Sequence, residues 1–189
     1  PAIPLPSYPL LSLALACAVA EAGGESIGAD LDVKWPNDVL HRGKKLCGVL
    51  AESRALEPGS APALVVGAGV NVNQLETDFP PEIRDRATSL RMAAGGLTVG
   101  IPSLFAETLA RYERYVALAG DGDPGALFRR VRPWLPANGA SVRVLQRGRV
   151  VDGIVEDVTE TGALRVRLFF VEHGGHFAGV VPHLLHRAR

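Results

Sequence analysis

The sequence has no excess of charge of either sign, and it is poor in cysteine, methionine and aromatic residues. Its 20 lysines and arginines balance 20 aspartates and glutamates, so no overall positive field would hold nucleic acid or an anionic membrane surface. Any partner must therefore be recognised at a local site. With 189 residues, the chain can form one domain of ordinary size, or a larger domain with a small appendage.

The two cysteines carry information about the cellular compartment. Cys17 and Cys47 both lie among apolar residues, which suits buried, reduced thiols better than a disulfide framework. Reduced thiols are typical of intracellular proteins, so we expect a cytoplasmic protein.

The apolar segment from Leu10 to Ala20 resembles the core of a signal peptide, but no lysine or arginine precedes it. The run is also shorter than the roughly 18 residues that a membrane span needs. We therefore expect a buried helix that begins near Pro9 and is stopped by Gly23-Gly24. The chain opens on Pro1 instead of methionine, so we expect it to be a fragment of a longer protein.

The next segments read as β-strands with little helix between them. They are rich in β-branched residues and are bounded by proline, glycine and asparagine. Adjacent strands without intervening helices favour an antiparallel or mixed sheet over a βαβ repeat. The expected strands are 32–35, 45–52 and 63–73, with a turn at 36–38 and a surface segment at 74–100.

From Ile101 the apolar residues recur at spacings of three and four, which predicts an amphipathic helix packed with one face on the sheet. After 136–139 the pattern changes to alternation, with glycine-rich turns between short apolar runs. Such a tail is typical of a small all-β module, and we predict that its loss would leave the sheet folded. The predicted fold class is α+β: residues 1–136 form a mixed or antiparallel sheet with packed helices, and residues 137–189 form a small all-β module.

Three runs could carry chemistry. Residues 34–38 place a cation, an aromatic ring, a proline, an amide and a carboxylate at the end of one strand, although a capping turn explains an Asn-Asp pair equally well. The strand at 45–52 opens with Lys44-Lys45 and contains Gly48, and the next contains Gly67-Ala68-Gly69 followed by Asn71. Glycines inside neighbouring strands predict a flat floor on which a ligand could lie.

In order and spacing, these runs resemble biotin protein ligases. The resemblance rests on Lys-Trp-Pro-Asn-Asp at 34–38, Lys-Leu-Cys-Gly-Val-Leu-Ala-Glu at 45–52, Gly-Ala-Gly-Val-Asn-Val-Asn at 67–73 and Ala-Thr-Ser-Leu at 87–90. It implies a class II synthetase-like catalytic domain and a small barrel of the Src-homology kind. It also implies a two-step reaction: the biotin carboxylate attacks the α-phosphate of ATP, with Mg²⁺, to form biotinyl-5′-AMP, and a lysine of a biotin carboxyl carrier protein then accepts the biotin.

The resemblance also assigns roles. Lys45 and Asp38 would be catalytic, and Trp35 would be a core or pocket-wall residue. The remaining assignments are biotin binding by Lys45, Gly48, Gly67 and Gly69, nucleotide binding by Lys34, Asn37 and Asn71, and a metal held by Asp38 and Asn71.

The chain also departs from this family. Biotin ligases carry a Ser-Thr-Asn strand and a Gly-Arg-rich loop upstream of the first helix, and neither occurs here. We therefore expect an N-terminally incomplete catalytic domain that, alone, forms biotinyl-5′-AMP poorly or not at all. The alternative is a non-catalytic biotin-binding or dimerisation module that has lost the loop that covers the adenylate.

Other partners and metals are less supported by the sequence. No helix-turn-helix precedes the catalytic motifs, so we expect no DNA binding, and we expect no membrane binding. The resemblance allows a homodimer. The five histidines are scattered without neighbouring cysteines, which argues against a zinc site, and no nucleophile-elbow motif supports Ser/His/Asp catalysis.

Overall fold

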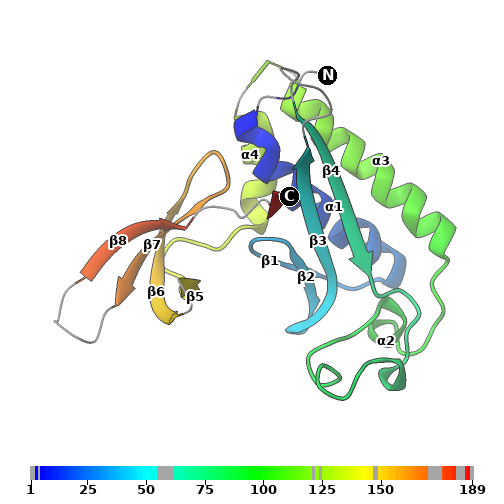
Figure 1. Ribbon diagram of the computed structural model, residues 1–189. Coiled ribbons are helices and arrows are strands. Elements are labelled where there is room, and N and C mark those ends of the chain that lie inside the picture. The colour runs from blue at the N-terminus through cyan, green and yellow to red at the C-terminus, as the bar shows by residue number, and fades with distance from the viewer. Residues whose placement is uncertain are drawn as a thin grey trace.

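The computed structural model describes residues 3, 5–54, 62–120, 122–123, 125–146, 149–169, 176–181 and 186–187. Figure 1 shows a larger body that contains the first four strands and the helices, and a second β-sheet beside it. The helices are α1 (Tyr8–Ile27), α2 (Leu90–Ala93), α3 (Ile101–Gly120) and α4 (Ala126–Val131). The strands are β1 (Asp32–Lys34), β2 (Asp38–His41), β3 (Lys44–Arg54), β4 (Ala63–Val70), β5 (Ser141–Gln146), β6 (Arg149–Val158), β7 (Leu164–Phe169), β8 (His176–Val181) and β9 (His186–Arg187).

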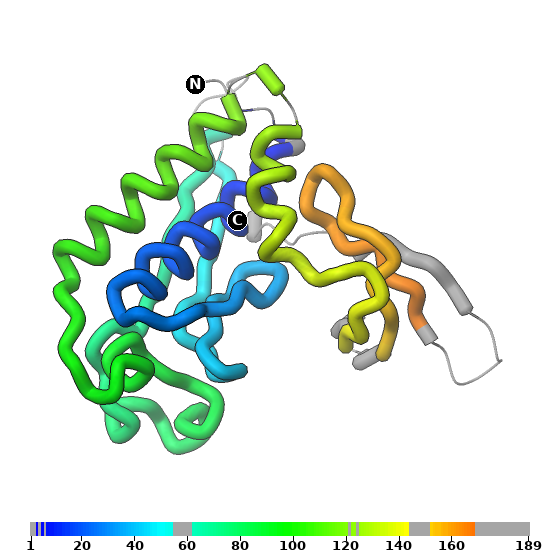
Figure 2. Tube along the Cα trace, turned by 180° about the vertical axis from the view of Figure 1, so that it is seen from behind, coloured from blue at the N-terminus to red at the C-terminus, as the bar shows by residue number. Residues whose placement is uncertain are grey.

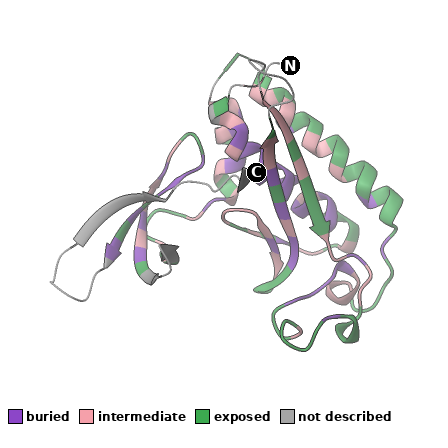
Figure 3. Ribbon diagram, viewed as in Figure 1, coloured by how far each residue is buried: buried purple, intermediate pink, exposed green. Residues whose placement is uncertain are grey.

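Helix α1 is the central helix of the protein and is buried along most of its length (Figure 3). The expectation that Gly23-Gly24 stops it is wrong, because the helix continues to Ile27 and ends at Gly28, whose left-handed φ of 64° closes the last turn. The two glycines instead allow close packing. A Cβ atom on Gly23 would lie 3.1 Å from the side chain of Leu31, and one on Gly24 would lie 2.7 Å from the carbonyl oxygen of Ala29.

By length and hydropathy alone, α1 could also cross a membrane, since its 20 residues include an 18-residue window of mean hydropathy 1.4. However, 72% of that window is buried inside the protein. The fold itself therefore covers the apolar surface of this helix, as is usual for a core helix.

The first sheet has the order β1-β2-β3-β4, with every neighbouring pair antiparallel. Strand β9 adds to β3 in parallel, so the sheet is mixed, as the sequence predicts. The sequence does not predict β2, because Asn37-Asp38 has the composition of a turn. Asp38 is nevertheless the first residue of β2 and pairs with Gly48 of β3.

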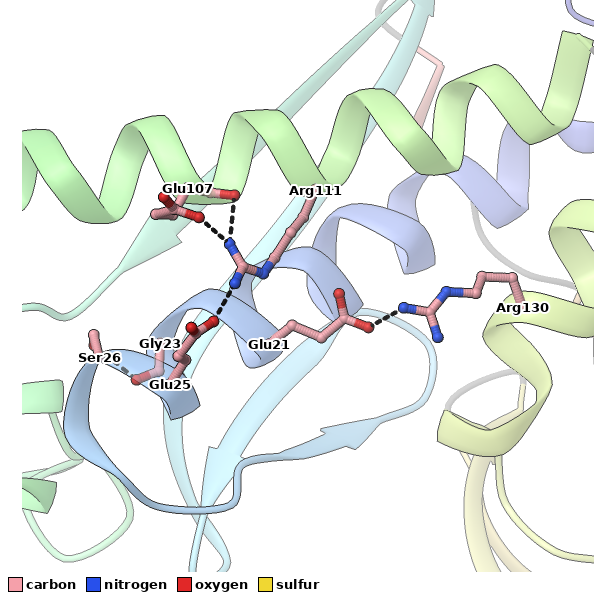
Figure 4. Close-up of polar contacts among 7 residues, drawn as sticks. All are labelled: Glu21, Gly23, Glu25, Ser26, Glu107, Arg111 and Arg130. Atoms are coloured by element: carbon pink, nitrogen blue, oxygen red, sulfur yellow. Dashed lines mark hydrogen bonds and ion pairs between the residues drawn. The ribbon is translucent and has the colours of Figure 1, made fainter.

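Helix α1 packs on the first sheet, against β1, β2, β3 and β4. Helix α3 packs against α1, so the prediction that α3 lies on the sheet is wrong. Figure 4 shows two of the ties: Arg111 of α3 pairs with Glu25, and Arg130 of α4 pairs with Glu21 at 2.6 Å. Part of the apolar face of α3 stays exposed to solvent, including Phe105 at 68%.

The second sheet has the order β5-β6-β7-β8 and is antiparallel throughout. The predicted closed barrel is not confirmed: among the described strands, β5 and β8 are the two open edges of this sheet. The last described strand leaves the module, since β9 pairs with β3 of the first sheet. Figure 2 shows the hairpin of β6 and β7 beside the helices.

One hydrophobic cluster runs through both parts of the protein. It joins Leu10 and Leu13 of α1 and Val131 of α4 to Val155 and Val166 of the second sheet, each at most 1% exposed. The boundary predicted at 136–137 matches the change from helices to strands, but the described core does not divide there. The division of the chain into two domains at this boundary therefore stays a prediction.

Candidate active site

A β-bulge places Lys45 on the open face of the first sheet. Val39 pairs with Cys47 and Leu40 pairs with Lys45, so Leu46 is an extra residue without a partner on β2. An extra residue reverses the alternation of side chains between the two faces of a strand. Leu46 and Cys47 are accordingly both buried, at 0% and 1% exposed. Lys45 therefore shares a face with Gly48, which a regular strand would not allow, and Lys44 lies on the other face.

The ammonium group of Lys45 forms an ion pair with the carboxylate of Asp38, with 2.5 Å between Nζ and Oδ1. Both groups lie above Gly48, where an added Cβ atom would be 3.1 Å from Lys45 Nζ and 3.6 Å from Asp38 Oδ1. A side chain at Gly48 would therefore compete with the ion pair for space. The pair is partly exposed, with 51% of the Lys45 side chain accessible to solvent, so it remains reachable by a ligand.

A cavity of about 480 Å³ opens above this pair. Among the described residues, its wall contains three cations, Lys34, Lys45 and Arg86, and one carboxylate, Asp38, so this part of the lining carries two net positive charges. Lys34 and Arg86 form no ion pair with another described residue. Unpaired cations around a cavity favour an anionic ligand. The other lining residues are Leu40, Gly43, Cys47, Gly48, Gly69, Asn71, Ile83 and Ala87.

The segment after β4 forms one wall of the cavity, although the sequence places it on the surface. The Lys45 amide donates to the Arg86 carbonyl at 2.7 Å, and the Thr88 amide donates to the Lys45 carbonyl at 2.9 Å. The side chain of Asn71 donates to the Thr88 carbonyl at 3.0 Å. These bonds bury residues 87–90, so the expected surface path is wrong for this part of the segment. Backbone pairing, which leaves no mark in composition, fixes this wall beside Lys45.

Six of the predicted site residues meet at the cavity: Lys34, Asp38, Lys45, Gly48, Gly69 and Asn71. The two other predicted site residues, Asn37 and Gly67, are not part of the cavity wall. The Asn37 side chain donates to the Val49 carbonyl and its own carbonyl accepts from the Val49 amide, so it holds the turn against β3. Gly67 pairs with Leu50 further along β4. The sequence reasoning missed Arg86, since a single arginine in a polar segment gives no signal.

The described residues offer a metal ion few ligands of their own. They contain no group of three or more His, Cys, Asp or Glu side chains placed to bind one. Asp38 supplies a carboxylate and Asn71 supplies an amide oxygen, because its nitrogen is engaged with Thr88. Two oxygen ligands fit Mg²⁺ only when phosphate oxygens and water complete its six positions.

Cys47, in the cavity wall, should resist alkylation. Burial raises the pKa of its thiol to about 12, with Lys45 lowering it by less. At pH 8, roughly one thiol in ten thousand would be the reactive thiolate. We expect no iodoacetamide adduct on Cys47 in the native chain after one hour by mass spectrometry, and complete labelling in 6 M guanidinium. Rapid labelling of the native chain would show that the floor of the cavity is open.

Known proteins resemble this chain in sequence and in fold. Residues 3–71 match the model of the biotin/lipoate A/B protein ligase family. The biotin protein ligase of Aquifex aeolicus in complex with biotin and ATP superposes with a TM-score of 0.69 at 26% identity, covering 90% of this chain and 67% of that one. Over these residues the chain is similar to the biotin/lipoate A/B protein ligase family.

Two relatives show how much of this chain, and how much of each relative, the sequence similarity covers. The biotin–[acetyl-CoA-carboxylase] ligase of Mycobacterium tuberculosis is 34% identical over 169 residues, which cover 86% of this chain and 58% of that protein. The bifunctional ligase/repressor BirA of Bacillus subtilis is 47% identical over 95 residues, which cover 50% of this chain and 29% of that protein. The chain therefore spans less than two thirds of the length of either relative.

Proposed function

We propose that this chain contributes the substrate-binding sheet of a biotin protein ligase, which activates biotin with ATP and transfers it to a lysine of a biotin carboxyl carrier protein. The observation that carries the proposal is the Lys45–Asp38 pair above Gly48, at the floor of a cavity with two net positive charges. Glycines at 48 and 69 leave the floor without side chains, so an apolar ring system can lie on it. The cations suit a carboxylate and a phosphate chain, which repel each other in water.

In the first step, a carboxylate oxygen of biotin forms a bond to the α-phosphorus of ATP, and the bond between that phosphorus and the bridging oxygen breaks to release pyrophosphate. Lys45 would hold the carboxylate and an α-phosphate oxygen together and stabilise the added negative charge. Lys34 would bind a phosphate, and Arg86, as a further cation of the wall, would do the same. Mg²⁺ would enter with the phosphates and neutralise the pyrophosphate, and Asp38 and Asn71 would supply its protein oxygens.

In the second step, the amine of the carrier lysine forms an amide bond to the acyl carbon. The acyl–phosphate bond breaks, AMP leaves, and the amine loses a proton. We propose that the protein is cytoplasmic, because both of its cysteines are buried free thiols and a reducing compartment keeps thiols in this form. The expectation of no DNA binding stays a prediction, because relatives named ligase/repressor share 29% of their length with this chain. Pairing of two copies also stays a prediction.

The proposal is tested by titrating biotin into the chain in a calorimeter and by measuring pyrophosphate release with Mg-ATP and biotin together. We expect saturable biotin binding and pyrophosphate release that requires both substrates, with biotinyl-5′-AMP detected by mass spectrometry. Replacing biotin with lipoate serves as the specificity control. Biotin binding without any pyrophosphate release would favour the non-catalytic module, and binding of neither substrate would contradict the proposal.

A further inference from the structure

The tryptophan inside the run 34–38 makes a polar contact with the second sheet. The indole nitrogen of Trp35 donates a hydrogen bond to the carbonyl oxygen of Gly162 at 2.9 Å. The two residues lie 127 positions apart in the chain. Trp35 is not part of the cavity wall, yet it directly follows Lys34 and lies three residues before Asp38, which both are.

Gly162 belongs to the turn between β6 and β7, and this turn is closed by its own hydrogen bonds. The Gly162 amide donates to the Thr159 carbonyl at 2.8 Å, and the Ala163 amide donates to the Thr159 hydroxyl at 3.1 Å. Gly162 has a φ of 81°, which favours glycine. The position of its carbonyl is therefore fixed by the turn and not by the Trp35 side chain.

The same turn is pressed against helix α1. A Cβ atom on Gly162 would lie 2.7 Å from Cδ2 of Leu10, which is 1% exposed. Ala163 and Leu164, next in the chain, are also buried, at 8% and 2%. The turn thus contacts the core helix on one side and the Trp35 indole on the other, so it cannot shift without disturbing one of them.

We propose that the turn Thr159–Ala163 of the second sheet positions the segment Lys34–Asp38, with Trp35 as the positioning residue. Only the expected change in KM for Mg-ATP rests on the proposed function; the positioning of the segment does not. The hydrogen bond holds the segment at its second residue, next to the cation at one end and three residues before the carboxylate at the other. Lys34 pairs with Asp38 across β1 and β2, so loss of the bond leaves the biotin floor on β3 and β4 intact but loosens this hairpin, and Lys34 with it, relative to the floor.

The decisive variants are Trp35→Phe, which removes the indole N–H and keeps an aromatic ring, and Gly162→Ala, which keeps the carbonyl but forces the turn away from Leu10. Amide hydrogen exchange of the full chain, without substrates, reports the segment directly. We expect exchange at residues 33–39 to accelerate about fivefold in both variants, in line with the loss of one hydrogen bond. In pyrophosphate release, KM for Mg-ATP should rise about fivefold, while the dissociation constant of biotin stays within twofold.

Two matched controls separate positioning from general loosening. Tyr8→Phe removes one aromatic hydrogen bond to a backbone carbonyl, that of Pro62, without touching the turn. Gly139→Ala strains a glycine with a φ of 86° at which an added Cβ atom meets nothing within 4 Å. Both controls should leave exchange at 33–39 unchanged. If neither variant accelerates this exchange, or if the controls do so equally, the inference is overturned. A native chain that binds no substrate would contradict the proposed function, while the exchange data would still decide this inference.

Discussion

Substituting Lys45 with alanine should reduce biotin-dependent pyrophosphate release by about 30- to 1,000-fold, which corresponds to roughly 2–4 kcal/mol of transition-state stabilisation by a positioned donor. The reason is that its ammonium group is the cation held directly above Gly48, beside the carboxylate of Asp38 in the cavity wall. The measurement is kcat/KM for biotin at saturating Mg-ATP.

Lys44→Ala is the matched control, because Lys44 is adjacent and equally cationic but lies on the opposite face of β3 and outside the cavity wall. It should change kcat/KM by less than about threefold, as substitutions away from a site usually do. Equal losses in the two variants, or a larger loss for Lys44→Ala, would show that the bulge does not direct Lys45 toward the substrate.

Removing residues 137–189 should unfold the remaining chain or leave it without fixed tertiary packing. The second sheet shares one hydrophobic cluster with Leu10, Leu13 and Val131, and each such side chain contributes about 1.5–3 kcal/mol when it is buried. Uncovering several of them approaches the 5–15 kcal/mol that keeps a typical domain folded. We expect loss of the near-UV circular dichroism signal and strong dye binding to exposed apolar surface.

A point variant tests the same contact without a truncation. Leu10→Ala should lower the free energy of unfolding by about 2–5 kcal/mol in urea titrations of the whole chain. The control is Leu5→Ala, since Leu5 is 55% exposed and should change stability by less than about 0.5 kcal/mol. A truncated chain with a cooperative transition at the original urea midpoint would instead support two independent modules.

The sequence identified six of the twelve described residues of the cavity wall, but it could not predict how the wall is assembled. Side-chain alternation alone places Lys45 and Gly48 on opposite faces, and the bulge at Leu46 reverses this. The bulge depends on tertiary pairing with β2, a strand that the sequence does not predict. Arg86 likewise reaches the cavity through backbone bonds to Lys45 and not through any motif.

Glycine illustrates the same limit in the helices. Gly23-Gly24 reads as a helix stop because glycine weakens isolated helices. In the fold, the close approach of Leu31 and Ala29 requires these positions to be small, and packing outweighs the propensity. The apolar alternation of the tail predicted its strands correctly, but closure into a barrel depends on strand pairing, which alternation does not encode.

The burial of α1 on several sides also has a consequence for the order of events during synthesis. The helix precedes almost all of its packing partners in the chain, and Tyr115, Val131, Val155 and Val166 follow it by about 100 residues or more. A ribosome adds roughly 5–20 residues per second, so this apolar helix stays uncovered for several seconds while the rest of the chain emerges. Contacts so distant in sequence also slow folding. The segment that is most deeply buried in the finished protein is therefore the one most exposed to chaperones and to aggregation while the protein is made.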